Sequence, residues 1–204
     1  MTTVEIDTPH GPARAHLNPV DEPRAALVLC HGAGGGVDSR DLTAATDAAR
    51  SEGVSVALVE QPYRVAGRRS PAPARQLEAA WIAVVEHLTA NELDGSPLIV
   101  GGRSLGARVA CRCLEATGGI AVLCLAFPLQ PRRRTGDPPP SRLPELDAVT
   151  VPTLVVQGEA DPFGMPPPGP DREVVTVPGT HSLRNRGAIV AAVQAWLPRQ
   201  VSGR

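Results

Sequence analysis

Three side chains of the kinds that carry out acyl transfer each follow an apolar run of this sequence. Ser104 lies in the pentapeptide GRSLG (102–106), directly after the run 97–102, and Asp161 and His181 each follow a later run. A histidine can take the proton of a serine hydroxyl, while a carboxylate holds the imidazole in the correct tautomer. We therefore predict Ser104 as nucleophile, His181 as base and Asp161 as the acid that orients the base.

The context of Ser104 gives the short pattern G-x-S-x-G its meaning. An exposed nucleophile at a sharp strand-to-helix turn needs small residues two positions before and after it, because the two backbones approach closely. Gly102 and Gly106 occupy these positions, between an apolar run and a helical pattern over 105–116. The alternative is an ordinary turn in which Ser104 is an incidental helix cap.

A glycine-rich segment, HGAGGG (31–36), follows the apolar run 25–30 and suggests a second part of the site. Acyl transfer needs two amide donors for the oxygen that becomes negative. We expect one to be the N–H of Leu105 and the other that of Ala33, with Gly34 as the alternative. The segment lacks the Lys-Ser/Thr of a phosphate-binding loop and the glycine spacing of a dinucleotide fingerprint.

The roles of acid and base have competitors elsewhere in the chain. Glu159 also follows the run 153–158 and is the alternative to Asp161, which we favour because it lies further beyond the strand end. His31 is interpreted as a structural residue that shapes the glycine-rich loop. The remaining histidines are assigned to structural positions, His10 and His16 in an N-terminal hairpin and His87 in a helix. The order Ser, acid, His agrees with an α/β-hydrolase triad.

Alternating apolar runs and helical patterns predict the elements that must position these residues. Continuous apolar runs, typical of strands buried on both faces, lie at 25–30, 54–59, 97–102, 121–127, 153–158 and 173–177. Helical patterns lie at 41–52, at 71–90 after a Ser70-Pro71 cap, at 105–116, and at 187–197 before Pro198. Period-two patterning between Val4 and Leu17 predicts a β-hairpin. Together they predict an α/β fold with a mostly parallel sheet and helices on both faces.

Composition sets the outer limits on function. A chain of 204 residues favours a single domain over 1–204, and the net charge of -1 argues against a nucleic-acid partner held by bulk electrostatics. No signal pattern begins the sequence, and the longest apolar run, 120–127, is too short to span a membrane. We expect a cytoplasmic protein without metal or organic cofactor; the oligomeric state is not indicated. The cysteines, expected to be buried free thiols, are Cys30, Cys111, Cys113 and Cys124.

Four segments of the chain, HGAGG, GGRSLG, GEADPFG and GTHSL, resemble the motifs of the α/β-hydrolase superfamily over roughly residues 20–198. Within it, the chain is similar to the small branch of dienelactone-hydrolase-like proteins and the hydrolase-like domain of a non-specific lethal complex subunit; Arg103 and Arg108 of GGRSLGAR support the latter. The loop 128–144 is too short for a cap domain, which implies compact substrates. Within it, Arg132-Arg133-Arg134 is interpreted as a solvated cluster, with attraction of a carboxylate as the alternative.

The resemblance and the residues imply one leading function and one rival. The leading function is hydrolysis of an acyl bond through a covalent acyl-enzyme, with a carboxylic ester of a small molecule as substrate and thioesters or amides behind it. The rival is a non-catalytic binding or scaffold protein that retains the fold. Tyr63 and Arg64 follow the run 54–59 at the same sheet edge, where contact with substrate or a packing role is open.

Overall fold

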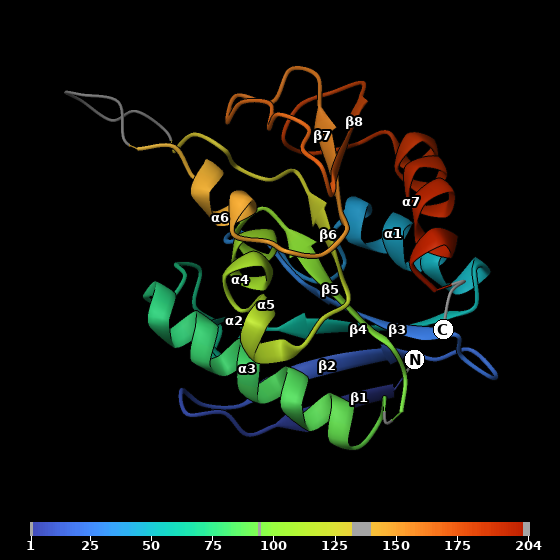
Figure 1. Ribbon diagram of the computed structural model, residues 1–204. Coiled ribbons are helices and arrows are strands. Elements are labelled where there is room, and N and C mark those ends of the chain that lie inside the picture. The colour runs from blue at the N-terminus through green and yellow to red at the C-terminus, as the bar shows by residue number, and fades with distance from the viewer. Residues whose placement is uncertain (1, 94, 132–139, 202–204) are drawn as a thin grey trace.

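The computed structural model describes residues 2–93, 95–131 and 140–201. In this part of the chain, eight strands form one sheet in the order β1-β2-β4-β3-β5-β6-β7-β8 (Figure 1). The strands are β1 (Thr2–Ile6), β2 (Ala13–Asn18), β3 (Ala25–Cys30), β4 (Val54–Glu60), β5 (Leu98–Arg103), β6 (Ala121–Leu125), β7 (Thr153–Gly158) and β8 (Arg172–Val177).

The predicted N-terminal hairpin and the mostly parallel sheet are both confirmed. Strands β1 and β2 pair antiparallel, with Ile6 opposite Ala13, and β2 joins the sheet antiparallel to β4. All pairs from β4 to β8 are parallel, so the carboxyl ends of these strands meet at one edge. That edge is where an open α/β sheet builds its functional sites.

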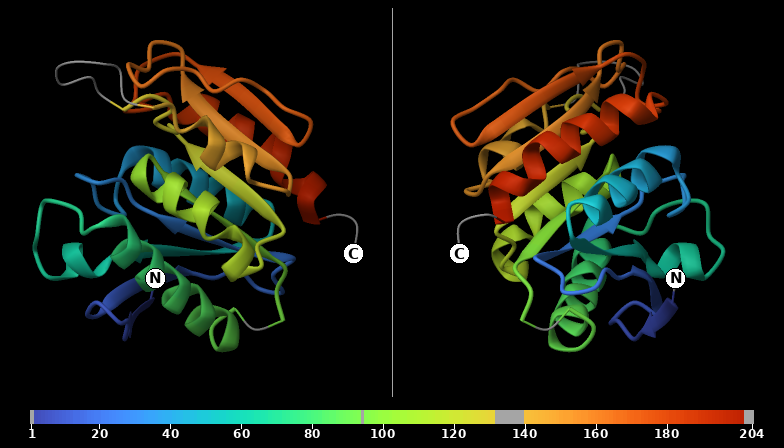
Figure 2. Two further views of the ribbon diagram at one scale, coloured as in Figure 1. Left: turned by 60° about the vertical axis from the view of Figure 1, so that its left-hand side comes forward. Right: turned by 90° about the vertical axis from the view of Figure 1, so that its right-hand side faces the viewer.

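Helices cover both faces of the sheet, as predicted. They are α1 (Arg40–Ser51), α2 (Pro62–Val65), α3 (Ala74–Ala90), α4 (Leu105–Arg112), α5 (Leu114–Thr117), α6 (Leu143–Asp147) and α7 (Arg186–Val201). Helices α1 and α7 pack side by side on one face, and α3 to α6 contribute to the core on the other (Figure 2). The burial of both sheet faces explains why the central strands are continuously apolar. Strand β8 differs from the prediction for 173–177, because it is the edge strand and only Val177 of it is buried.

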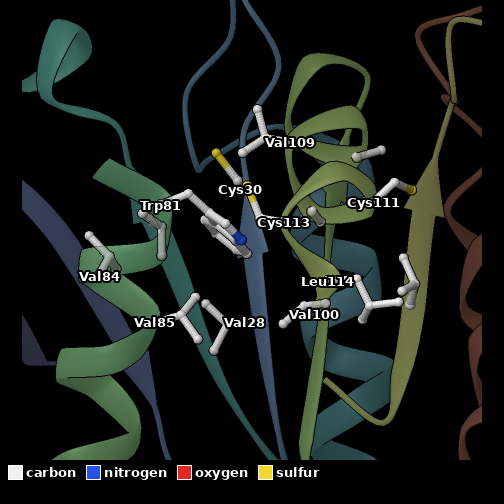
Figure 3. Close-up of a cluster of buried hydrophobic side chains, with 14 of the residues drawn as sticks. Val28, Cys30, Trp81, Val84, Val85, Val100, Val109, Cys111, Cys113 and Leu114 are labelled. Carbon is white, nitrogen blue, oxygen red and sulfur yellow. The ribbon is translucent and has the colours of Figure 1, made fainter. Parts of the chain in front are cut away.

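The core beneath α3 and α4 contains all four cysteines. Trp81 of α3 points into this layer, close to Val28 and Cys30 of β3 (Figure 3). All four thiols are free and buried, as expected from their places in apolar and helical patterns. Burial raises the pKa of Cys30 and of Cys113 to about 12, so both stay protonated at neutral pH.

Two helices differ from their predicted bounds near their ends. Helix α3 begins at Ala74 rather than at residue 71, because Pro73 disfavours a helical conformation at the residue before it. The helix predicted over 105–116 is divided into α4 and α5 at Cys113, whose ψ angle is 7°. The four-residue α2 had no counterpart among the predicted helices.

The helix predicted to stop at Pro198 continues through it, which corrects that prediction. Helix α7 runs to Val201 with Pro198 inside it. Trp196 and Leu197 are buried against the layer that contains α1, and this packing offsets the loss of one backbone hydrogen bond at proline, about 3 kcal/mol. The strand predicted over 121–127 ends at Leu125, because Ala126 turns the chain with a φ of 51°.

Between β6 and β7 the described residues contain only the short helix α6, which begins inside the segment predicted as a loop. The described residues of this segment form no cap domain over the sheet edge, as predicted. The cluster Arg132 to Arg134 lies outside the described residues. Among the described helices, none is both long and apolar enough to cross a bilayer.

Candidate active site

The carboxyl edge of the sheet brings the three predicted side chains into one hydrogen-bonded chain. Ser104 follows β5, Asp161 follows β7 and His181 follows β8. The Ser104 hydroxyl oxygen lies 2.9 Å from Nε2 of His181, and Nδ1 of the same ring lies 2.8 Å from Oδ2 of Asp161. Both distances are those of direct hydrogen bonds.

Ser104 occupies a strained backbone position at the sharp turn between β5 and α4. Its φ is 51° and its ψ is −106°, a conformation that residues with side chains rarely adopt. The flanking glycines are required sterically: a Cβ at Gly102 would stand 2.5 Å from the Cys30 carbonyl oxygen, and one at Gly106 would overlap that same carbonyl group. The Ser104 N–H donates to the Leu125 carbonyl at 2.8 Å, which ties the turn to β6.

Of the two acids after β7, the structure places Asp161 against the histidine. The Asp161 side chain is 1% exposed and accepts a second hydrogen bond from the Phe163 N–H at 2.9 Å. Glu159 is exposed, and in the described part of the chain its side chain makes no hydrogen bond or ion pair. Asp161 is thus fixed in one orientation by its surroundings, whereas Glu159 faces solvent.

Gln157, which was not predicted as a site residue, donates a hydrogen bond to the Asp161 carboxylate. This fully buried residue of β7 has its Nε2 2.9 Å from Asp161 Oδ2, 3.0 Å from the Phe127 carbonyl and 2.9 Å from the Gly164 carbonyl. All three neighbours are acceptors, so the amide nitrogen and not the amide oxygen faces them, and its two N–H groups are shared among the three. The signal that was available is a polar residue inside an otherwise apolar strand.

The loop that carries Asp161 packs directly on the loop that carries His181. The Ala160 N–H donates to the Gly179 carbonyl at 2.9 Å, and a Cβ at Gly158 would stand 2.5 Å from the Thr180 carbonyl oxygen. The ring of Phe163 lies 4.5 Å from the ring of His181, centroid to centroid. The imidazole is therefore held on one side by an aromatic ring and remains partly accessible to solvent.

Arg103, the residue before the serine, reaches across the site. Its Nε donates to Oδ2 of Asp41 at 2.7 Å, and its Nη2 donates to the His181 carbonyl at 3.2 Å. Asp41, at the start of α1, is buried. Nothing in the sequence indicates that Asp41, 62 residues away, is the partner of Arg103.

The two predicted amide donors lie at the expected loops. Leu105 is the first residue of α4, and Ala33 lies in the turn after β3. Among the described residues, neither N–H has a hydrogen-bond acceptor, and the same is true of Gly34, the alternative. The Ala33 carbonyl is held by the Tyr63 hydroxyl at 2.9 Å, which gives Tyr63 a positioning contact with this loop.

His31 has the structural environment that was expected of it. Its Nδ1 lies 2.8 Å from the Gly32 carbonyl, and its Nε2 lies 3.1 Å from the Gln61 N–H. A carbonyl needs a donor and an N–H needs an acceptor, so the ring is neutral and protonated at Nδ1. Burial lowers its pKa from the ordinary value near 6.5. His10 and His16 lie in the hairpin and His87 in α3, as predicted.

A hollow of about 360 Å³ adjoins the site beside Arg103. It is lined by Gly34, Gly35, Ser39, Arg40, Asp41, Arg103, Ser182 and Arg184. Several of these residues are direct neighbours in sequence of Ala33, Ser104 or His181, so the hollow opens along the edge where the loops meet. In the described ranges, no group of three or more His, Cys, Asp or Glu side chains is arranged to hold a metal ion.

A mostly parallel sheet of this strand order, with a serine on a strained turn after β5, is the architecture of an α/β hydrolase. The chain belongs to the alpha/beta hydrolase domain family, whose model matches residues 23–170. The match includes Ser104 and Asp161 and ends before His181.

Solved structures of similar fold cover nearly the whole chain. A serine hydrolase without a lid from Xanthomonas campestris has 23% identity and a TM-score of 0.74, over 97% of this chain and 95% of its own. Est1E from Butyrivibrio proteoclasticus has 18% identity and a TM-score of 0.78, over 98% and 99%. A dienelactone hydrolase from Anabaena variabilis has 16% identity and a TM-score of 0.71, over 95% and 93%. Comparison with curated protein sequences gave no match.

Proposed function

We propose that this protein is a serine hydrolase that cleaves a carboxylic ester of a small substrate. The observation that carries the proposal is the unbroken chain of hydrogen bonds from Ser104 through His181 to Asp161, built on a serine with a φ of 51°. A fold can host many chemistries, so the proposal rests on these side chains and not on the fold.

In the proposed reaction, the Ser104 oxygen attacks the ester carbonyl while Nε2 of His181 takes the hydroxyl proton. Asp161 accepts the Nδ1–H hydrogen bond and so keeps Nε2 free as the base. The negative oxygen of the tetrahedral intermediate accepts hydrogen bonds from the N–H groups of Ala33 and Leu105. His181 then gives its proton to the leaving alkoxide, and the acyl group stays on Ser104.

Water completes the cycle by the same route in reverse. His181 takes a proton from water, the resulting hydroxide attacks the acyl-enzyme, and the acid leaves as the proton returns to Ser104. An esterase domain from Rhodothermus marinus and a dienelactone hydrolase among proteins of similar fold support an ester as the substrate class. The absence of a cap domain over the described edge supports a compact substrate.

A fluorophosphonate probe tests the proposal directly, because it reacts covalently only with an activated serine. We expect the wild-type chain to be labelled and to hydrolyse p-nitrophenyl acetate, and the Ser104→Ala variant to do neither while keeping the same thermal unfolding midpoint. A folded wild-type chain that is neither labelled nor active would instead favour the non-catalytic binding or scaffold role.

A further inference from the structure

We infer that Arg103 is a positioning residue that locks the three loops of the active site to one another. The inference rests on the proposed function and adds a residue to it that neither the family match nor the serine motif assigns. Arg103 fills one of the two variable positions of G-x-S-x-G, where the pattern itself asks for no particular side chain.

The Arg103 side chain extends from the serine turn toward the other two segments of the site. Its own backbone belongs to the serine turn, and its Nη2 donates to the carbonyl of His181 at 3.2 Å. Its Nη1 lies under the glycine-rich loop, where a Cβ at Gly32 would stand only 2.7 Å from it. The side chain that leaves the serine turn thus hydrogen-bonds the segment of the base and lies beside Gly32, the residue before the Ala33 amide donor.

Asp41 fixes the direction in which the guanidinium points. Its carboxylate is buried, with a side chain 1% exposed, and receives Nε of Arg103 at 2.7 Å. Its second oxygen accepts the Leu42 N–H at 3.0 Å, so the carboxylate is anchored to the first turn of α1. A buried carboxylate without its cation is costly, and this holds Arg103 in place.

The contact with His181 is made through the backbone, and this determines the expected effect. Losing it leaves the imidazole chemistry intact but frees the loop that keeps Nε2 2.9 Å from the serine oxygen. Misplacing a catalytic group by about 1 Å can cost about 100-fold in rate. Because His181 acts in both acylation and deacylation, the loss belongs to kcat, while KM for a small ester stays close to that of the wild type.

The test replaces Arg103 by alanine and then adds guanidinium ions back at concentrations well below those that unfold the protein. The hollow of about 360 Å³ beside Arg103 and Asp41 gives a small planar cation access to the vacated position. We expect Arg103→Ala to lower kcat for p-nitrophenyl acetate by about 10- to 100-fold. Guanidinium should restore a large part of it, whereas urea and sodium chloride should not.

Arg112→Ala is the matched control. Arg112 is also ion-paired, with Glu78, and its side chain is 20% exposed against 18% for Arg103, but it lies at the far end of α4. We expect it to leave kcat unchanged. Unchanged kcat in Arg103→Ala, or recovery that sodium chloride produces equally well, overturns the positioning role.

A double-mutant cycle with Asp41→Asn separates positioning from folding. In the Arg103→Ala background, Asp41→Asn removes an unpaired buried charge, so the unfolding midpoint should rise while kcat stays low. Losses in kcat that simply multiply, with no recovery of stability, contradict the proposed coupling.

The outcomes separate the positioning role from the proposed function. If the wild-type chain itself hydrolyses no ester, the proposed function fails. If the wild type is active and Arg103→Ala is without effect, the function stands and the positioning role fails. The ring resonances of His181, measured by NMR, report the displacement without turnover.

Discussion

At the scale of single residues, the hydrogen-bond donors around the buried Asp161 carboxylate distinguish it from the exposed Glu159. The Asp161 carboxylate receives hydrogen bonds from Gln157 and from the Phe163 backbone in addition to its contact with His181. These fixed donors hold the carboxylate ready for the imidazole before any substrate binds. Glu159, two residues earlier, is exposed to solvent and has none of these donors among the described residues.

This difference predicts unequal effects at the two acids. Asp161→Asn presents an amide where the Nδ1–H of His181 needs a carboxylate, favours the wrong tautomer, and should lower kcat by about 10⁴-fold, as the equivalent change does in other triads. Glu159→Gln should change kcat by less than about twofold, since surface substitutions seldom matter. Steady-state kinetics on p-nitrophenyl acetate measure both. The opposite ranking would move the acid role to Glu159.

The buried imidazole of His31 predicts a pH dependence of stability. Burial lowers its pKa in the folded chain, and the neutral ring accepts the Gln61 N–H. Above the pKa of the unfolded chain, about 6.5, the ring is neutral in both states, so its ionisation does not change the free energy of unfolding. As the pH falls from there through the pKa of the folded chain, the unfolded chain binds the proton first, and the free energy of unfolding decreases. Each pH unit inside that window removes about 1.4 kcal/mol.

Urea unfolding at pH 7 and pH 5 measures the effect, with His31→Gln as the control that cannot titrate. All other histidines are common to both proteins, so the difference between the two slopes belongs to His31. The wild type should lose more stability on acidification. Equal losses in the two proteins would mean that the ring does not stay neutral in the folded state.

At the scale of elements, packing prevails over local sequence preference in helix α7. Pro198 lacks an N–H, yet the helix continues through it to Val201 while Trp196 and Leu197 stay buried. Pro198→Ala should therefore raise the free energy of unfolding by about 1 to 3 kcal/mol, because alanine supplies the missing donor and suits a helix interior. Urea unfolding measures the gain. A loss of stability would show that the proline ring itself contributes to the packing.

The same scale explains what the sequence could and could not reveal. All six parallel strands were found. Five of them are covered on both faces, as β3 and β7 are, and must be apolar throughout; β8 was found by its valines although it is the edge strand. The serine turn was found because Gly102 and Gly106 are sterically required around it. The bond between Asp41 and Arg103 was not, since it depends on how helix α1 packs against the sheet. The short helices α2 and α6 have too few residues to show a helical period.

At the scale of the whole molecule, the described residues place no cap domain over the carboxyl edge of the sheet. Between β6 and β7 the described residues offer only the five-residue helix α6 as cover. A cap domain would supply the apolar wall that buries a long acyl chain, at about 0.8 kcal/mol for each methylene. Without it, added carbons soon lie in water and contribute nothing to binding.

The open edge predicts how activity depends on acyl length. Across p-nitrophenyl esters from acetate to laurate, kcat/KM should rise over the first few carbons and then level off. Rates must be compared below the micelle concentration of each ester, so that aggregation does not imitate a plateau. A steady rise up to laurate would reveal an acyl groove and contradict the prediction.

The strained backbone at Ser104 lowers the stability of the folded chain and so affects which substitutions at this position are favourable. A non-glycine residue held in this conformation costs about 1 to 3 kcal/mol, which the packing and hydrogen bonds around the turn must offset. Ser104→Gly should therefore be more stable than both the wild type and Ser104→Ala in urea unfolding, although it is inactive. If the proposed function were no longer needed, a single substitution at this position would make the chain more stable, so the strained turn ties the stability of the fold to the presence of its nucleophile.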